Sequence, residues 1–214
     1  MIGAELKAPR AGAVAGILFS ILLIISLVIL RLSIPANPDD AGKWLPSSGR
    51  SIRLALSLLP FAGIAFLWFI GVLRDRMGEL EDRFFATVFL GSGILFLAML
   101  LTFSAIAGGI IMSYGVLTGK LIESGIYTFA RTMAYVTVNV CAMKMAGVFM
   151  ITASTLAIRI GIFPRWMAFL GYVLALFLLL SSGVLSWSPL VFPLWVLVIS
   201  TYILFANLRP EVTA

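Results

Sequence analysis

Residues 11–30 read AGAVAGILFSILLIISLVIL, a stretch of twenty residues without a charge between Arg10 and Arg31. A helix of about 20 apolar residues is long enough to cross the hydrocarbon core of a bilayer, which is roughly 30 Å thick. A cleaved signal peptide is the competing interpretation, but its apolar region usually has about 7–15 residues and ends in a site of the A-x-A type. No clean site of that type follows this stretch. We therefore expect an uncleaved transmembrane helix here.

The composition extends this expectation to the whole chain. Of its 214 residues, 62% are hydrophobic and 11% are charged, whereas soluble domains are about 25% charged. The formal net charge is +6, but the basic residues are scattered and form no block with interleaved aromatic residues. We therefore expect an integral membrane protein in contact with the lipid bilayer, without binding to nucleic acid.

The residue types that are missing exclude several chemistries. The chain has no histidine, which removes the usual zinc sites and the catalytic triads that need an imidazole. It has one cysteine, Cys141, so no intrachain disulfide can form. Its nine acidic residues all lie outside the apolar runs, which leaves no paired acid and base inside the membrane. We expect no catalytic residues, no cofactor and no metal, and an enzyme acting in the membrane is the less favoured class.

Charged residues divide the rest of the chain into further apolar runs. Residues 54–73 are again 20 uncharged residues, with a helix kink expected at Pro60. Residues 84–119 would make one helix of about 54 Å, so we expect a span that ends near residue 106 and is loosened at Gly108 and Gly109. Residues 166–208 are also too long for one span, and SSGVLSWSP at 181–189 predicts a break there.

Together these runs predict an all-α fold, because the alternating pattern of a membrane-barrel strand is absent. We expect one transmembrane domain over residues 1–214, a polytopic membrane helical bundle with six transmembrane helices, at residues 11–30, 54–73, 84–106, 132–158, 166–182 and 189–207. With six spans, both termini lie on one side of the membrane.

Lysine and arginine residues in short loops predict the orientation, because they concentrate on the cytoplasmic side. The side of the termini carries eight of them: Lys7, Arg10, Arg74, Arg76, Arg83, Arg159, Arg165 and Arg209. The other side carries six: Arg31, Lys43, Arg50, Arg53, Lys120 and Arg131. We therefore expect both termini in the cytoplasm.

Lys144 is the one charged residue inside the fourth run, residues 132–158. It follows Arg131 by 13 positions and precedes Arg159 by 15, which places it near the midplane if the two arginines lie at the interfaces. A charge there costs about 2.5–3.5 kcal/mol on insertion scales. The alternative is snorkelling, which requires the helix to be displaced along its axis, since the midplane is about 15 Å from either interface.

No acidic residue of the chain lies in a span to pair with Lys144. Three arrangements remain open: a neutral amine, a polar cavity or bound anion, and a carboxylate from another subunit. Helical spacing groups Lys144 with Thr137 and Cys141 on a thin polar face, which we expect to point inward. Asn139, about 140° away, is assigned to a different interface. Lys144, Cys141 and Thr137 form the candidate binding site.

The loop RDRMGELEDR at residues 74–83 is a second candidate. Asp75, Glu79 and Asp82 share one face of a helical turn, which is the spacing of a conceivable metal site. Glu79 and Arg83 instead form a favourable i,i+4 pair, and the acids suit the start of the next helix. We therefore expect no metal here, and a docking surface for a soluble partner as the functional alternative.

Two further segments concern packing. Residues 113–130 are semi-polar and are expected to lie in the membrane interface, or less readily to re-enter the membrane and bring Glu123 towards Lys144. Gly12 and Gly16 form a G-x-x-x-G pattern, which is typical of a close helix–helix contact. The sequence GSG at residues 91–93 lacks the context of a nucleotide-binding loop and is interpreted as a packing notch.

Residues 159–176, RIGIFPRWMAFLGYVLAL, combine a basic residue, a short break, Pro-Arg-Trp and a glycine-containing span. This pattern resembles small uncharacterised bacterial multi-pass inner-membrane proteins that carry a domain of unknown function. The resemblance implies a bacterial inner-membrane (plasma membrane) helical bundle and supplies no activity or site residue.

The functional expectation is a non-catalytic accessory or interaction subunit of a membrane assembly, whose partners are other membrane subunits or further copies of itself. The alternative is a small transporter or channel in which Lys144 holds an anionic or carboxylate solute. These classes differ in where the charge of Lys144 is satisfied: by another protein in the first, and by a solute in a cavity in the second.

Overall fold

The computed structural model describes residues 8–34, 45–77, 83–117, 119–161, 164–181 and 187–206. All regular structure in these residues is helical, which confirms the all-α fold. The long helices are α1 (Ala8–Ser33), α2 (Leu45–Met77) and α3 (Arg83–Leu117). After the short α4 (Gly119–Glu123), one rod contains α5 (Ile126–Val136), the π-helical turn η2 (Thr137–Ala142) and α6 (Met143–Ile160). The chain ends with α7 (Arg165–Leu180), the 3-10 turn η3 (Ser188–Leu190) and α8 (Val191–Ala206).

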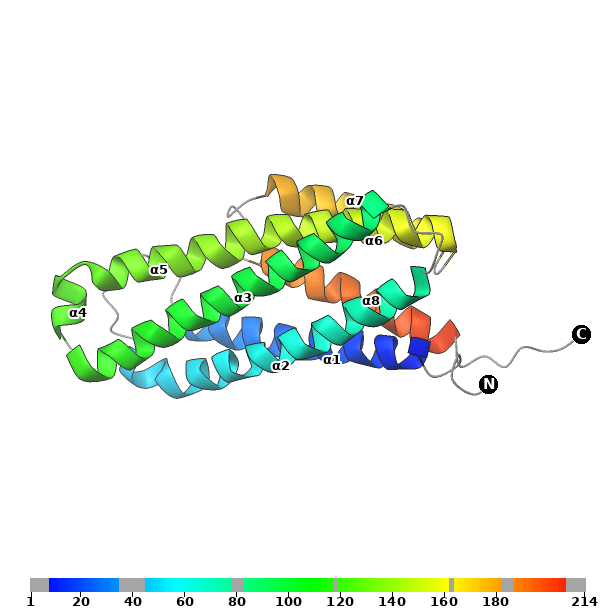
Figure 1. The fold of residues 1–214 in the computed structure, drawn as a ribbon. Helices are drawn as coiled ribbons and strands as arrows, with labels where there is room; N and C mark the ends of the chain where they lie inside the picture. Colours follow the sequence, from blue (N-terminus) through cyan, green and yellow to red (C-terminus); the bar gives the residue numbers. More distant parts are fainter. Residues whose placement is uncertain are drawn as a thin grey trace, which may run out of the picture.

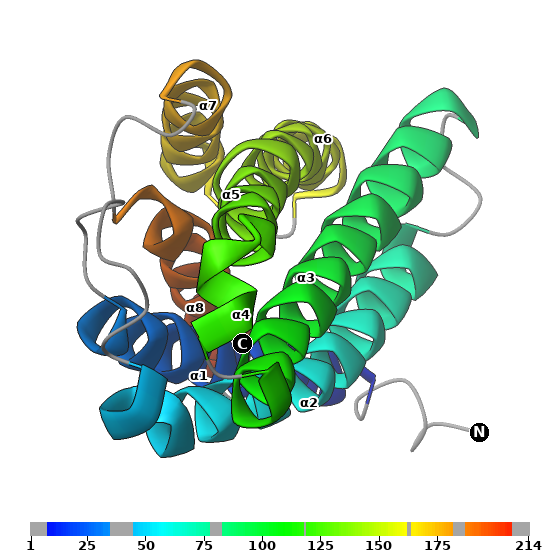
Figure 2. The ribbon, with the colours of Figure 1, turned by 90° about the vertical axis from the view of Figure 1, so that its left-hand side faces the viewer.

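The helices run antiparallel to their sequence neighbours along the length of one elongated bundle (Figure 1). Helix α1 begins and α8 finishes at one end of the bundle, which we call the terminal end. At the opposite end, which we call the α4 end, α4 joins α3 to α5. Seen from the α4 end, α8 lies behind, between α1 and the α5–α6 rod, and α7 covers α6 on the outside (Figure 2).

Among the residues that the structure describes, five helical segments are long and apolar enough to cross a membrane: Arg10–Ser33, Ser47–Arg74, Phe84–Leu117, Ile126–Arg159 and Ser188–Ala206. The segment Arg165–Leu180 is apolar but shorter. The chain is thus a helical bundle with five candidate membrane spans. Five of the six expected helices meet the length of a membrane span, and the sixth, α7, has 16 residues.

The predicted loosening of the third helix at Gly108 and Gly109 is wrong. Helix α3 continues through both glycines to Leu117 and has 35 residues, about 52 Å at 1.5 Å per residue. A glycine inside a helix costs about 1 kcal/mol relative to alanine. The end of α3 packs against α5 and buries Ala107 and Ile111, and this burial offsets the low helix propensity of the two glycines.

The inward fold of residues 113–130 that would bring Glu123 towards Lys144 is also wrong. These residues form the end of α3, α4 and the start of α5 at the tip of the bundle (Figure 1). Gly125, with φ of 73°, makes the turn between α4 and α5. Glu123 is exposed at this tip, whereas Lys144 lies 18 residues along the rod from Ile126, about 27 Å away. Glu123 therefore does not pair with Lys144.

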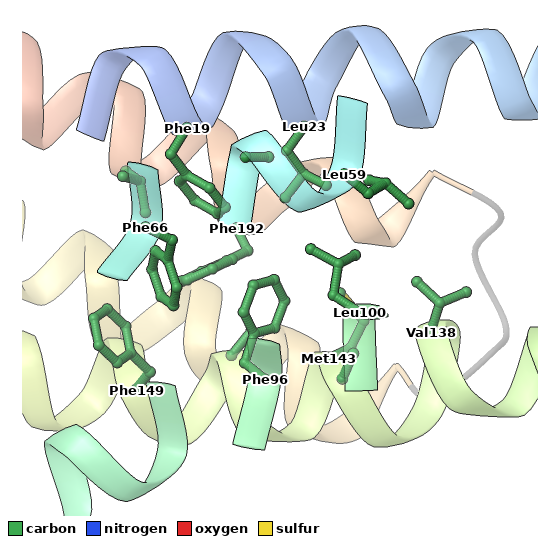
Figure 3. Close-up of a cluster of buried hydrophobic side chains, with 14 of the residues drawn as sticks. Phe19, Leu23, Leu59, Phe66, Phe96, Leu100, Val138, Met143, Phe149 and Phe192 are labelled. Atoms are coloured by element: carbon green, nitrogen blue, oxygen red, sulfur yellow. The ribbon is translucent and has the colours of Figure 1, made fainter. Parts of the chain in front are cut away.

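A cluster of phenylalanine rings forms the centre of the bundle (Figure 3). Phe66 of α2 is fully buried, and its ring centroid lies 4.6 Å from that of Phe19 and 5.4 Å from that of Phe96. Phe149 and Phe192 complete the contacts at 5.3 and 5.7 Å. These separations suit edge-to-face and tilted aromatic packing, so one cluster connects α1, α2, α3, α6 and α8.

Glycines allow the helices to approach around this cluster. A Cβ atom on Gly16 of α1 would meet Phe69 and the hydroxyl of Ser200, and one on Gly12 would lie 2.6 Å from Val72. The predicted contact through Gly12 and Gly16 is therefore confirmed, against α2 and α8. In the GSG sequence, a Cβ atom on Gly93 would meet Ile70 and Phe149, whereas one on Gly91 would meet nothing within 4 Å, and Ser92 is buried.

Candidate functional site

Lys144 lies on the α5–η2–α6 rod, two residues after the π-helical turn. A π-helical turn inserts one residue into an α-helix through i→i+5 hydrogen bonding, and such turns are frequent at functional sites. An α-helix advances about 100° per residue at 3.6 residues per turn. The inserted residue therefore rotates α6 by about one residue relative to α5.

This rotation separates the residues of the predicted polar face. Lys144 and Cys141 are exposed, whereas Thr137 is buried and its hydroxyl donates a hydrogen bond to the carbonyl oxygen of Met133 at 2.7 Å. The expectation that Lys144 and Cys141 point inward with Thr137 is wrong, because it assumed regular α-helical spacing across residues 137–144. Lys144 and Cys141 face the outside of the bundle instead.

The contacts between α6 and α7 set the level of Lys144 along the bundle. The hydroxyls of Thr155 and Tyr172 are hydrogen-bonded at 2.8 Å. About two helical turns before Thr155 on α6, Gly147 lies against Ala175 and Leu179 of α7. Lys144 is one further turn along, level with the end of α7 at Leu180. It is therefore well inside the length of the rod, about 20 Å from Arg131 at 1.5 Å per residue.

No carboxylate among the described side chains is close enough to form a salt bridge with Lys144. Glu123 is the one acidic residue whose side chain is described, and it lies at the α4 end. The described residues contain no group of three His, Cys, Asp or Glu that could hold a metal ion. Of the second candidate, Asp75 belongs to α2 by its backbone, but its side chain, Glu79 and Asp82 lie outside the described residues.

The structure contains a cavity that the sequence analysis did not find. It has a volume of about 200 Å³, is partly open, and lies between α1 and α5 towards the α4 end. It is lined by Phe103 and Ala107 of α3 and by Pro189 and Leu190 of η3.

The cavity exists because the helices differ in length. Phe192 at the start of α8 packs against Phe19 of α1 with ring centroids 5.9 Å apart. Helix α1 continues to Ser33 beyond this level, 14 residues or about 21 Å further. Since α8 begins at Val191, it does not extend into the space between α1 and α5 towards the α4 end, and Pro189 and Leu190 of η3 line the cavity there.

The walls of the cavity combine polar and apolar side chains. Arg31 near the end of α1 and Arg131 of α5 both line it and are half-buried. Asn139 lies beside Val138 in the lining, and Leu27 and Ile34 of α1 contribute apolar side chains. The cavity is therefore mixed in character along its length.

Three residues of this cavity, Arg31, Arg131 and Asn139, have another interpretation in the sequence. There Arg31 and Arg131 mark the ends of spans, and helical spacing assigns Asn139 to a different interface from Lys144. Asn139 does lie on another face, since it lines the cavity while its side-chain amide donates to the carbonyl oxygen of Tyr135 at 3.1 Å. Nothing in the order of residues showed that α1 and α5 face each other across a gap.

Comparison of the chain with protein-family models, with curated proteins and with solved structures gives no match.

Proposed function

We propose that the chain is a non-catalytic accessory subunit of a membrane assembly, and that the outer face of the α5–η2–α6 rod around Lys144 is where another membrane protein packs. The observation that supports this proposal is the exposure of Lys144 on the side of the bundle, well inside the length of a helix that can cross the membrane. A functional group that served this chain alone would face its interior.

The energy of the charge is the physical argument. An ammonium in hydrocarbon costs about 2.5–3.5 kcal/mol on insertion scales, and a carboxylate brought by a partner helix offsets that cost. The C-terminal end of α7 lies at the same level and carries a partial negative charge of about 0.5, which is less than the charge of the ammonium. A complete counter-charge requires a second molecule.

A second copy of this chain does not supply that counter-charge. All nine acidic residues lie outside the apolar runs, so a homodimer through this face would bring two ammonium groups together. The proposed partner is therefore a different membrane protein with an aspartate or glutamate in a spanning helix. Transport of an anionic or carboxylate solute remains the alternative, but the residues that line the cavity at Arg31 and Arg131 do not include Lys144.

We propose further that α7 is a sixth crossing, and that the protein lies in a bacterial inner membrane with both termini in the cytoplasm. The start of α1 and the end of α8 lie at the same end of the bundle (Figure 1), which supports an even number of crossings. A helix of 16 residues is about 24 Å long, and a bilayer thins locally around a short span at modest cost. The excess of basic residues at the terminal end supports the orientation.

The test compares recovery of the partner from native membranes in mild detergent. We expect Lys144→Met to lose a stoichiometric partner that the wild type retains, and Lys144→Arg to retain it, because arginine keeps the charge. Lys120→Met is the matched control, since Lys120 is an exposed lysine of α4 and lies outside the proposed contact. The free energy of unfolding of the isolated Lys144→Met protein, measured by thermal unfolding, should equal that of the wild type within the effect of a surface substitution, about 0.5 kcal/mol.

Three results would contradict the proposal. The first is a wild-type protein that is a stable monomer when extracted gently. The second is equal recovery of the partner with Lys144→Met. The third is a homo-oligomer held together through the face around Lys144.

A further inference from the structure

We propose that water from the α4 side fills a recess inside the bundle down to η3, near the middle of the membrane. Helices α7 and α8 then cross hydrocarbon only between the terminal end and this level. The inference rests on the proposed crossings of the membrane. It goes beyond the proposed protein contact around Lys144, which lies on the outer face of the rod.

The arginines of the long helices locate the hydrocarbon region along the bundle. In α1, Phe19 lies 9 residues after Arg10 and 12 residues before Arg31. The two arginines are about 32 Å apart at 1.5 Å per residue, close to the hydrocarbon thickness of roughly 30 Å. In α2, Phe66, whose ring centroid is 4.6 Å from that of Phe19, lies 8 residues before Arg74. Both phenylalanines therefore lie near the middle of the membrane.

Helices α7 and α8 reach only this middle level, whereas α1, α2, α3 and the rod continue towards the α4 end (Figure 1). Phe192, the second residue of α8, has its ring centroid 5.9 Å from that of Phe19. The turn η3 comes directly before α8. It therefore lies about 15 Å short of the level of Arg31, by the rise of the 12 residues from Phe19 less the two residues between η3 and Phe192.

Backbone outside an α-helix is tolerated at this depth only where it is buried in protein or lines a water-filled cavity. The cavity between α1 and α5 is lined by Trp187, Pro189 and Leu190, so the backbone around η3 borders an open space. The cavity has a volume of about 200 Å³ and is partly open. Since one water molecule occupies about 30 Å³ in the liquid, several water molecules fit.

The aromatic cluster closes the recess towards the terminal end. Phe192 is fully buried, and its ring centroid lies 4.7 Å from that of Phe96 and 5.7 Å from that of Phe66. These rings fill the centre of the bundle directly beyond η3 (Figure 3). Water therefore reaches η3 from the α4 side and stops at the cluster.

The test measures how fast single cysteines, in a Cys141→Ser background, react with a charged, membrane-impermeant methanethiosulfonate. Leu190→Cys is the deep probe, because Leu190 is half-buried and lines the cavity. Leu18→Cys is the matched control, since this leucine is next to Phe19 and so at the same depth, but is 50% exposed and outside the described lining of the cavity. Ser124→Cys, exposed at the α4 end, identifies the α4 side in each membrane preparation.

We expect Leu190→Cys to react about a hundredfold faster than Leu18→Cys with reagent added from the α4 side, because the reactive thiolate is a charge and is disfavoured in hydrocarbon. Trp187→Cys replaces an exposed residue that also lines the cavity, and it should react as fast even if Leu190→Cys folds poorly. Adding Ala134→Leu, at a buried position of the lining, should slow both reactions. Circular dichroism of each variant monitors the fold.

Three results would overturn the proposal. The first is reaction of Leu190→Cys and Trp187→Cys no faster than that of Leu18→Cys. The second is reaction of both from the terminal end alone. The third is an equally fast reaction of Leu18→Cys, because this level of the bundle would then lie outside the hydrocarbon. A reversed orientation changes only the side from which Ser124→Cys reacts, and loss of the contact at Lys144 leaves all these rates unchanged, so failure of the proposed function is distinguishable.

Discussion

Two basic residues of one rod, Arg131 and Lys144, have different roles because they lie at different depths. Arg131 lines a cavity whose other arginine directly follows an apolar run of α1, so it is near the headgroup region. Lys144 lies about 20 Å deeper by helical rise and is exposed on the outer face. The two basic residues therefore differ in level and in exposure, and the proposed protein contact concerns Lys144.

At the residue scale, two glycines of α3 give a matched prediction. A Cβ atom on Gly93 would lie 2.6 Å from Cδ1 of Ile70 and 3.2 Å from the ring of Phe149, whereas one on Gly91 meets nothing within 4 Å. We expect Gly93→Leu to lower the free energy of unfolding by at least about 1–3 kcal/mol through overpacking. Gly91→Leu should leave it unchanged or raise it, because leucine favours the helix more than glycine does.

Thermal unfolding of both variants in the same detergent measures the difference. Gly91→Leu serves as the control for the effect of a larger side chain on α3 itself. If the two variants unfold at the same temperature, the close contact of α3 with α2 and α6 at Gly93 is not as described.

At the scale of elements, the sequence was sufficient to place most of the membrane helices. Charged residues such as Arg10 and Arg31 bound the apolar runs, and five of these runs became helices long enough to cross a membrane. The prediction that α3 ends near residue 106 is wrong. It rested on the low helix propensity of Gly108 and Gly109, whereas packing against α5 maintains the helix. Local sequence gives the propensity, and only the neighbouring helix gives the packing.

The candidate sites were less predictable for a related reason. The π-helical turn at Thr137–Ala142 has no distinctive sequence, yet it decides that Lys144 faces outward and that Thr137 is buried. The cavity lies where α1 extends further towards the α4 end than α8 does. This difference in extent is a relation between distant parts of the chain. Charge spacing therefore identified Lys144 as a special residue, but not the direction of its side chain or the fact that Arg31 and Arg131 line one cavity.

At the scale of the whole molecule, the aromatic cluster around Phe66 connects five helices and makes the bundle one unit (Figure 3). The proposed orientation of this unit can be tested with single cysteines in a Cys141→Ser background. Ser124→Cys lies at the α4 end, and Ala11→Cys and Ala206→Cys lie at the terminal end; all three positions are exposed. We expect a membrane-impermeant maleimide to label Ser124→Cys in intact cells and the other two only after permeabilisation.

The Cys141→Ser protein without an added cysteine, treated before and after permeabilisation, is the background control for this experiment, since Cys141 is the one cysteine of the chain. Labelling of Ala11→Cys and Ala206→Cys from opposite sides would show that α7 does not cross the membrane. Labelling of both from outside, with Ser124→Cys protected, would reverse the orientation.

Cys141 also provides the most direct test of the contact proposed around Lys144, because it is exposed, unique in the chain and three residues away. A photoreactive benzophenone maleimide is attached to Cys141 in native membranes and irradiated, and the products are identified by mass spectrometry. We predict a covalent adduct with a different membrane protein that has an aspartate or glutamate in a spanning helix, and loss of this adduct in Lys144→Met. Adducts with lipid alone, or with a second copy of this chain, would contradict the account.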